Sequence, residues 1–251
     1  MPLQRAAMLF PTTHWSLLAR ATMNGETEAR AALDELCRRY WAPLKQFIRA
    51  RGYPEAEAED LTQEFLLHLL ERSALRKPDP FRGRFRSFLL GALVKFLSHQ
   101  RERRSAQKRG GQHPHVSVET LEEGDGLGAP PSDEESAAFD RAWALAVVRT
   151  ALDQVGRSYE EAGQGGLFAV LRAFLPGSSA PPAYEEAAAR ANLSVAAFNS
   201  QVHRLRGQFR ECVYAEVMGT VSAPHEVEEE IAHLYRVLMN RGTDFQAPPE
   251  S

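Results

Sequence analysis

Apolar residues recur at intervals of three and four through residues 12–110, and no segment of useful length there alternates between apolar and polar residues. The first period is that of a helix with one buried face, whereas alternation is the period of a strand. Glycine and proline divide the pattern into four segments with short connections, which is typical of a compact helical bundle. We therefore predict an all-α fold, with a first domain over residues 12–110.

Charge is segregated along the chain, although the formal net charge is only −3 at pH 7. Residues 72–109 carry twelve Lys or Arg and two acids, whereas residues 112–140 carry eight acids and neither Lys nor Arg. The basic block is typical of a surface that binds a polyanion. The acidic stretch is also rich in Gly, Pro and Ser and poor in large apolar residues, so residues 111–136 are predicted to be a flexible acidic linker.

Helical periodicity resumes after the linker, and residues 137–215 are predicted to form a second helical domain. Within it, residues 184–191, 192–194 and 195–214 have the lengths of a short helix, a tight turn and a longer helix, the pattern of a helix-turn-helix. Four apolar residues of the longer helix share one face and are expected to be buried: Phe198, Val202, Leu205 and Phe209. Its other faces carry candidate contacts to duplex DNA: Ala197, Asn199, Ser200, Gln201, His203, Arg204 and Arg206.

The basic block interleaves phenylalanine with arginine, as in Phe81, Arg82, Phe85 and Arg86. Guanidinium groups neutralise phosphates, and flat rings beside them can hold bases that have left the duplex stack. The combination indicates binding to single-stranded or locally melted DNA. The alternative is that the phenylalanines are core residues and the arginines form a solvated face of the same helix.

Asp60 and Glu64 lie one helical turn apart, with Gln63 beside them. Two carboxylates at that spacing could ligate a divalent metal in a DNA-processing enzyme, but no third acid or histidine converges from a recognisable motif. Taken alone, these residues favour a solvated helix face. We therefore expect no catalytic residue, metal or cofactor, and a function that is not enzymatic.

The motif Ala-Glu-Asp-Leu-Thr-Gln-Glu-Phe at residues 58–65, an Arg- and Phe-rich helix, an acidic linker and the helix-turn-helix around residues 198–206 together resemble bacterial RNA polymerase sigma factors of the extracytoplasmic-function (ECF) type. The resemblance covers about residues 12–215 and implies a region-two-like domain followed by a region-four-like domain. It implies that four residues bind core polymerase: Asp60, Gln63, Glu64 and Phe65. It implies that the proximal promoter element is contacted by Arg82, Arg84, Arg86, Phe88, Lys95, His99, Arg101, Arg103, Arg104, Lys108 and Arg109, and the distal element by the helix-turn-helix.

A sigma factor of this kind would bind core RNA polymerase, recognise promoter DNA and promote strand opening. We expect a cytoplasmic protein without a membrane span, monomeric outside the holoenzyme and open to control by an anti-sigma factor or another regulatory protein. The alternative is a helix-turn-helix regulator that binds operator DNA, as a dimer on a symmetric site, and does not act as a sigma factor. Residues 216–251 are predicted to be a helical extension that packs on the second domain or masks the surface around Arg204.

Overall fold

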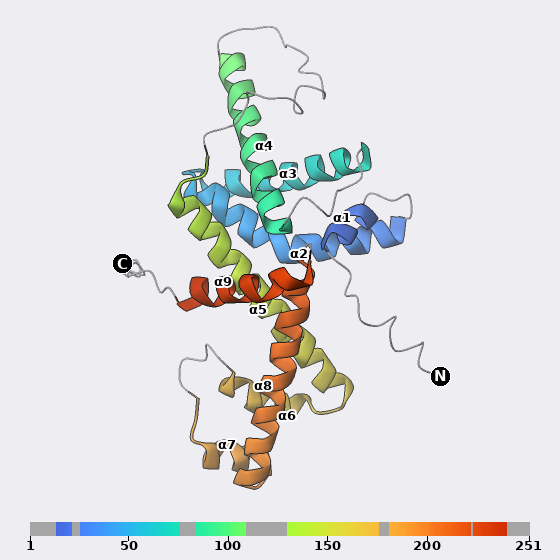
Figure 1. Ribbon diagram of the computed structural model, residues 1–251, viewed down its shortest axis with the longest axis vertical. Helices are drawn as coiled ribbons and strands as arrows, with labels where there is room; N and C mark the ends of the chain where they lie inside the picture. The colour runs from blue at the N-terminus through green and yellow to red at the C-terminus, as the bar shows by residue number, and fades with distance from the viewer. Residues whose placement is uncertain are drawn as a thin grey trace.

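The computed structural model describes residues 14–21, 26–75, 84–108, 130–175, 181–221 and 223–239. Within those ranges the secondary structure is helical and there is no strand, so the prediction of an all-α fold is confirmed. Figure 1 shows an elongated molecule, with α1 to α4 toward one end and α6, α7 and the start of α8 toward the other. The helices are α1 (His14–Ala21), α2 (Glu26–Ala50), α3 (Glu55–Leu75), α4 (Phe85–Lys108), α5 (Asp133–Glu161), α6 (Gly165–Leu171), η3 (Arg172–Phe174), α7 (Tyr184–Arg190), α8 (Val195–Met218), η4 (Pro224–Glu226) and α9 (Val227–Met239).

Helices α1 to α4 pack around one apolar core, in which Tyr40, Phe47, Phe65 and Phe85 are fully buried. All four are among the apolar residues that recur at helical spacing through residues 12–110. Gly52 follows the end of α2 with a φ of +90°, a conformation that glycine adopts readily and other residues avoid. This turn lets α3 start at once and pack against α2.

Helix α5 starts at Asp133, earlier than the predicted start of the second domain, because a capping box fixes its first turn. The Ser132 hydroxyl accepts the Glu135 backbone N–H at 3.2 Å, and the Glu135 carboxylate accepts the Ser132 backbone N–H at 2.8 Å. Acids in a first turn also complement the helix dipole. The helix therefore includes residues 133–136, which the composition predicts to be linker. Residues 111–129 of that linker lie outside the described residues.

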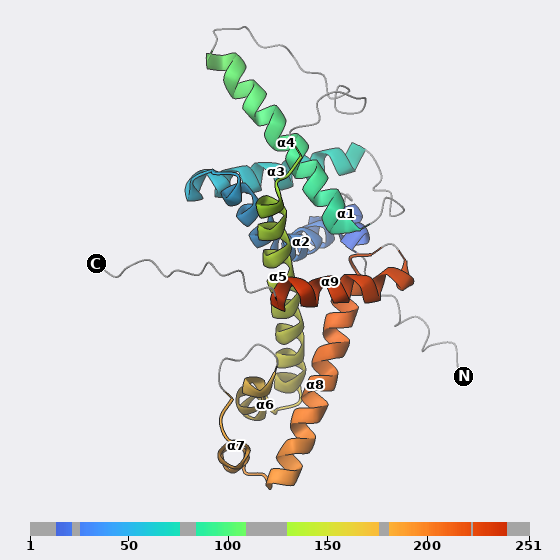
Figure 2. The ribbon, with the colours of Figure 1, turned by 60° about the vertical axis from the view of Figure 1, so that its left-hand side comes forward.

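Helix α5 belongs to both ends of the molecule, as the second view shows (Figure 2). Its first half buries Phe139, Trp143 and Val147 in the same core as α1 to α4. Its second half buries Val155 and Tyr159 in a second core with α6, α7 and α8. Residues assigned from sequence to two domains thus share a core. Because α5 runs through both cores, it connects the two ends of the molecule rigidly.

Helix α9, from the predicted C-terminal extension, crosses the junction between the two ends (Figures 1 and 2). Its apolar stripe faces inward: Val227 and Leu234 are buried in the first core, and Ile231 and Leu238 pack at its edge. The helix contacts α5 and α8, both from the predicted second domain. It leaves Arg204 exposed.

Candidate nucleic-acid interface

Helices α7 and α8 are joined by the short turn that the sequence predicts. Asn192 in this turn has a φ of +54°, in the left-handed region that asparagine tolerates better than most residues. Ser194 then caps α8, its hydroxyl accepting the Ala197 backbone N–H at 3.2 Å. The predicted apolar stripe is confirmed: Phe198, Val202 and Leu205 are buried in the second core, and Phe209 is partly buried.

The predicted distal contacts lie mostly at the surface of α8. Gln201 is half-buried, and six others are exposed: Ala197, Asn199, Ser200, His203, Arg204 and Arg206. Arg206 has a structural partner, because its Nε and Nη2 donate to the Phe174 carbonyl at 3.1 and 3.0 Å. Asn199, His203 and Arg204 make no hydrogen bond or ion pair with the described residues, so their polar groups face solvent.

On α3, the predicted polymerase contacts divide between surface and core. Asp60, Gln63 and Glu64 are exposed on one side of the helix, and Glu64 accepts a hydrogen bond from Gln100 Nε2 at 2.8 Å. Phe65 is only 1% exposed and packs against Phe96 with ring centroids 5.6 Å apart. The Phe65 ring is therefore part of the core and not of the exposed face that carries Asp60, Gln63 and Glu64.

The predicted proximal contacts at the start of α4 are partly covered. Arg86 Nη1 donates to Asp140 at 2.8 Å, and Arg84 Nη2 donates to Glu229 at 2.9 Å. Phe88 is half-buried, with its ring centroid 4.8 Å from that of Trp15. These three predicted DNA contacts therefore have partners inside the protein.

Farther along α4, from Lys95 onward, most of the predicted contacts face solvent. Lys95, Arg101 and Arg103 are exposed and form no ion pair with the described residues. Arg104 forms an ion pair with Glu57 of α3, and this hydrogen bond raises the pKa of the guanidinium. His99 lies 3.5 Å from Glu102 on the next turn. Arg82, Arg109 and the side chain of Lys108 lie outside the described residues.

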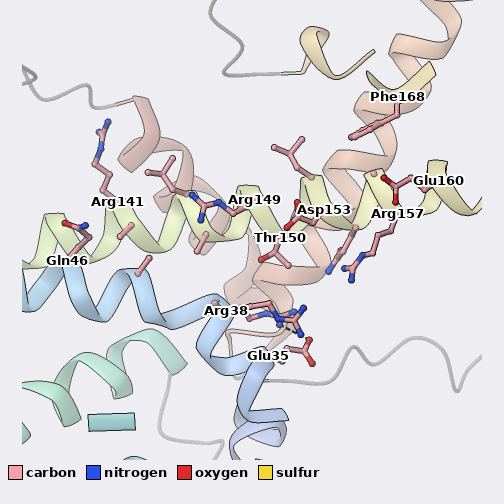
Figure 3. A pocket seen from close by; sticks show the side chains of 18 of the residues that line it. Glu35, Arg38, Gln46, Arg141, Arg149, Thr150, Asp153, Arg157, Glu160 and Phe168 are labelled. Atoms are coloured by element: carbon pink, nitrogen blue, oxygen red, sulfur yellow. Dashed lines mark hydrogen bonds and ion pairs between the residues drawn. The ribbon is translucent and has the colours of Figure 1, made fainter. Parts of the chain in front are cut away.

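A groove of about 1070 Å³ runs between α2 and α5 and reaches Phe168 of α6 (Figure 3). Its lining includes small side chains such as Ala42 and Ala142, together with Leu145, which is 48% exposed. Its charged lining residues are Arg38, Arg39, Arg141, Arg149, Arg157, Glu35, Asp153 and Glu160. The groove is therefore mildly basic, and none of the residues predicted to contact DNA or polymerase lines it.

The sequence analysis missed a buried polar cluster where the end of α8 meets α1 and α2. His14 Nδ1 lies 2.6 Å from the Tyr40 hydroxyl. Burial, and secondarily the charge of Arg39, lower the pKa of His14 to about 3, so its ring is neutral near pH 7. Arg39 donates twice to Glu216 at 3.0 Å, and Gln154 Nε2 also donates to Glu216 at 2.6 Å.

One sequence signal could have revealed part of this cluster. Glu216 stands between Val213 and Val217, which continue the apolar stripe of α8. A carboxylate in a stripe that is otherwise buried needs a cation or several donors, because an unpaired buried charge is costly. The signal predicts that Glu216 has a partner, but not that the partner is Arg39.

The described residues contain neither a metal-binding cluster nor a membrane-spanning helix. Among them, no group of three or more His, Cys, Asp or Glu is arranged to hold a metal ion, and Asp60 and Glu64 lack a third ligand there. None of the helices in the described ranges is both long and apolar enough to cross a membrane.

Comparisons with known protein families, with curated proteins and with solved structures find no match to this chain.

Proposed function

We propose that this protein is a transcription initiation factor of the sigma type, which brings core RNA polymerase to a promoter and helps to separate the strands. The observation that carries the proposal is the exposed polar face of α8, the second helix of the helix-turn-helix. The opposite face of α8 is buried in the second core. A capped helix with amide and guanidinium groups on one side has the dimensions and the chemistry to read base edges in the major groove.

The face of α3 supports the sigma reading over that of a simple operator-binding protein. Asp60, Gln63 and Glu64 are exposed together, and a set of acids and amides on a rigid helix suits a basic protein surface rather than DNA. The exposed cations Lys95, Arg101 and Arg103 lie on α4, which packs in the same core as α3. The chain thus offers separate surfaces for a protein partner and for nucleic acid.

Run-off transcription tests this proposal directly. Purified core polymerase would be incubated with and without the full chain on a fragment from upstream of its own gene. We expect a discrete transcript that depends on the protein. A matched variant, Arg204→Ala, should reduce that transcript without lowering thermal stability, because Arg204 is exposed. Tight binding of a dimer to the fragment, with no transcript from added polymerase, would instead identify an operator-binding regulator.

A further inference from the structure

Two helices from distant parts of the sequence neutralise the arginines at the start of α4. Arg86 donates from Nη1 to Asp140 of α5 at 2.8 Å, and from Nε and Nη2 to Glu230 of α9, the latter at 3.3 Å. Arg84 lies 3.1 Å from Glu230 and donates to Glu229 at 2.9 Å. Both guanidinium groups are therefore held by carboxylates of the chain itself.

The network is largely buried. The Glu230 side chain is fully buried and that of Arg86 is 12% exposed, with its guanidinium 5.2 Å from the ring centroid of Trp143. Burial opposes the charge of Arg86, but its hydrogen bonds to Glu230 and Asp140 outweigh that effect and raise its pKa. His233 adds a further contact, with Nε2 2.9 Å from the second oxygen of Asp140. Because a buried carboxylate without a cation is costly, Glu230 depends on its ion pairs with Arg84 and Arg86.

The backbone holds the same junction closed. The segment between α8 and α9 accepts two hydrogen bonds from the starts of other helices: His14 N–H donates to the Gly219 carbonyl and Phe85 N–H to the Thr220 carbonyl, each at 2.9 Å. Val227 and Leu234 of α9 are buried in the core that contains Phe85. Helix α9 is therefore fixed against the start of α4, not merely near it.

We propose that α9 is an autoinhibitory clasp: Glu229 and Glu230 occupy Arg84 and Arg86, and the chain must release them before those arginines can bind nucleic acid. The inference rests on the proposed function, since it takes the start of α4 as part of the DNA surface. The Arg86 guanidinium is only 12% exposed, and it donates from Nε, Nη1 and Nη2 to Glu230 and Asp140, which leaves little of it within reach of a phosphate. If nucleic acid binds only the released form, the apparent affinity of the protein falls in proportion to the fraction of molecules in that form.

Charge-neutral replacement of the clasp tests this. The variant Glu229→Gln/Glu230→Gln keeps the side-chain shapes and removes the two carboxylates. Its binding to a fluorescein-labelled duplex with an unpaired centre should be about tenfold tighter than that of the unaltered chain. The salt dependence should steepen by up to about 1.8 in logarithmic slope, because each added phosphate contact contributes about 0.9.

The control must remove two carboxylates without removing an ion pair to Arg84 or Arg86. Glu211 on α8 and Glu228 on α9 are exposed and form no ion pair with the described residues, so Glu211→Gln/Glu228→Gln is matched. This control should bind DNA nearly as the unaltered chain does. An equal gain in both variants would overturn the proposal, because it would report net charge alone. A gain that survives the further change Arg84→Ala/Arg86→Ala would overturn it as well.

Hydrogen exchange on the unaltered chain tests the clasp even if the glutamine variant does not fold. Adding the same DNA should speed amide exchange in α9 and slow it in α4. Unchanged or slower exchange in α9 would overturn the clasp. The proposed function stands or falls separately: a clasp that opens on DNA together with failed run-off transcription would reject the sigma role while keeping the autoinhibitory contact.

Discussion

Helices α4 and α8 carry the two sets of predicted DNA contacts. Those on α8 are mostly exposed, whereas those at the start of α4 are paired with carboxylates of the chain. On α8 the buried stripe of Phe198, Val202 and Leu205 faces inward and the polar residues face solvent, as the periodicity predicts. On α4 Phe85 is also buried in the core, but Arg86 beside it donates to Glu230 and does not face solvent freely. Periodicity identifies the apolar face of a helix, but it does not say which distant element covers the rest.

The largest loss of stability should come from removing a large buried side chain from either core. Phe85→Ala and Phe198→Ala remove fully buried rings from α4 and α8, and each should lower the free energy of unfolding by about 3–5 kcal/mol. Urea unfolding measures this. The exposed Tyr214→Ala on α8 should cost far less, and a similar loss for all three variants would mean that the burial is misplaced.

The two ends of α4 should differ next. Arg86→Ala leaves Glu230 buried with Arg84 as a remaining cation and should cost about 3 kcal/mol of stability. Arg104→Ala breaks an ion pair at the surface and should cost roughly 0.2–1 kcal/mol. Thermal unfolding of both variants measures the contrast. Equal costs would show that the start of α4 is as solvated as its end.

The same contrast shows what could be predicted from sequence. The helices, the buried stripe of α8 and the exposed face of α3 all follow from local spacing, because a helix with one apolar face has few ways to bury it. The Arg86–Glu230 pair could not be predicted, since its partners are 144 positions apart. The start of α5 could have been: Ser132 and Glu135 form a capping box in the sequence, but the acidic composition around them indicated a linker.

On α8, two neighbouring arginines should separate reading from scaffolding. Arg204→Ala, and equally Gln201→Ala, should weaken binding to the cognate DNA by about 1–3 kcal/mol and relax specificity at one base. Arg206→Ala should instead lower stability by roughly 1 kcal/mol, because its side chain donates to the Phe174 carbonyl. Fluorescence anisotropy on single-base variants of the site, paired with thermal unfolding, measures both. A uniform loss across sequences for Arg204→Ala would indicate a phosphate contact.

The buried polar cluster where the end of α8 meets α1 and α2 should make stability sensitive to pH. Because burial lowers the pKa of His14 from 6.5 to about 3, the unfolded chain binds a proton below about pH 6.5 that the folded chain does not. Its contribution to stability is therefore constant above pH 6.5 and falls by about 1.4 kcal/mol for each pH unit between about 6.5 and about 3.

The variant His14→Gln isolates this effect, since it keeps a polar partner for the Tyr40 hydroxyl and does not titrate. Urea unfolding between pH 5 and 8 should show a weaker loss of stability in acid for His14→Gln than for the unaltered chain, because the two proteins share every other titrating group. Parallel pH profiles would show that His14 is open to solvent when folded.

The smallest effect on stability should come from α3, where the loss should instead appear in binding. Asp60 and Gln63 are exposed, so Asp60→Ala/Gln63→Ala should change the free energy of unfolding by less than about 0.5 kcal/mol. If this face meets polymerase, co-purification with core enzyme should fall sharply in the same variant. Phe65→Ala is the informative opposite, because Phe65 is buried and its loss should destabilise the core before it affects any surface. Undiminished co-purification by Asp60→Ala/Gln63→Ala would remove α3 from the polymerase contact and leave α8 as the remaining support for a DNA-directed role.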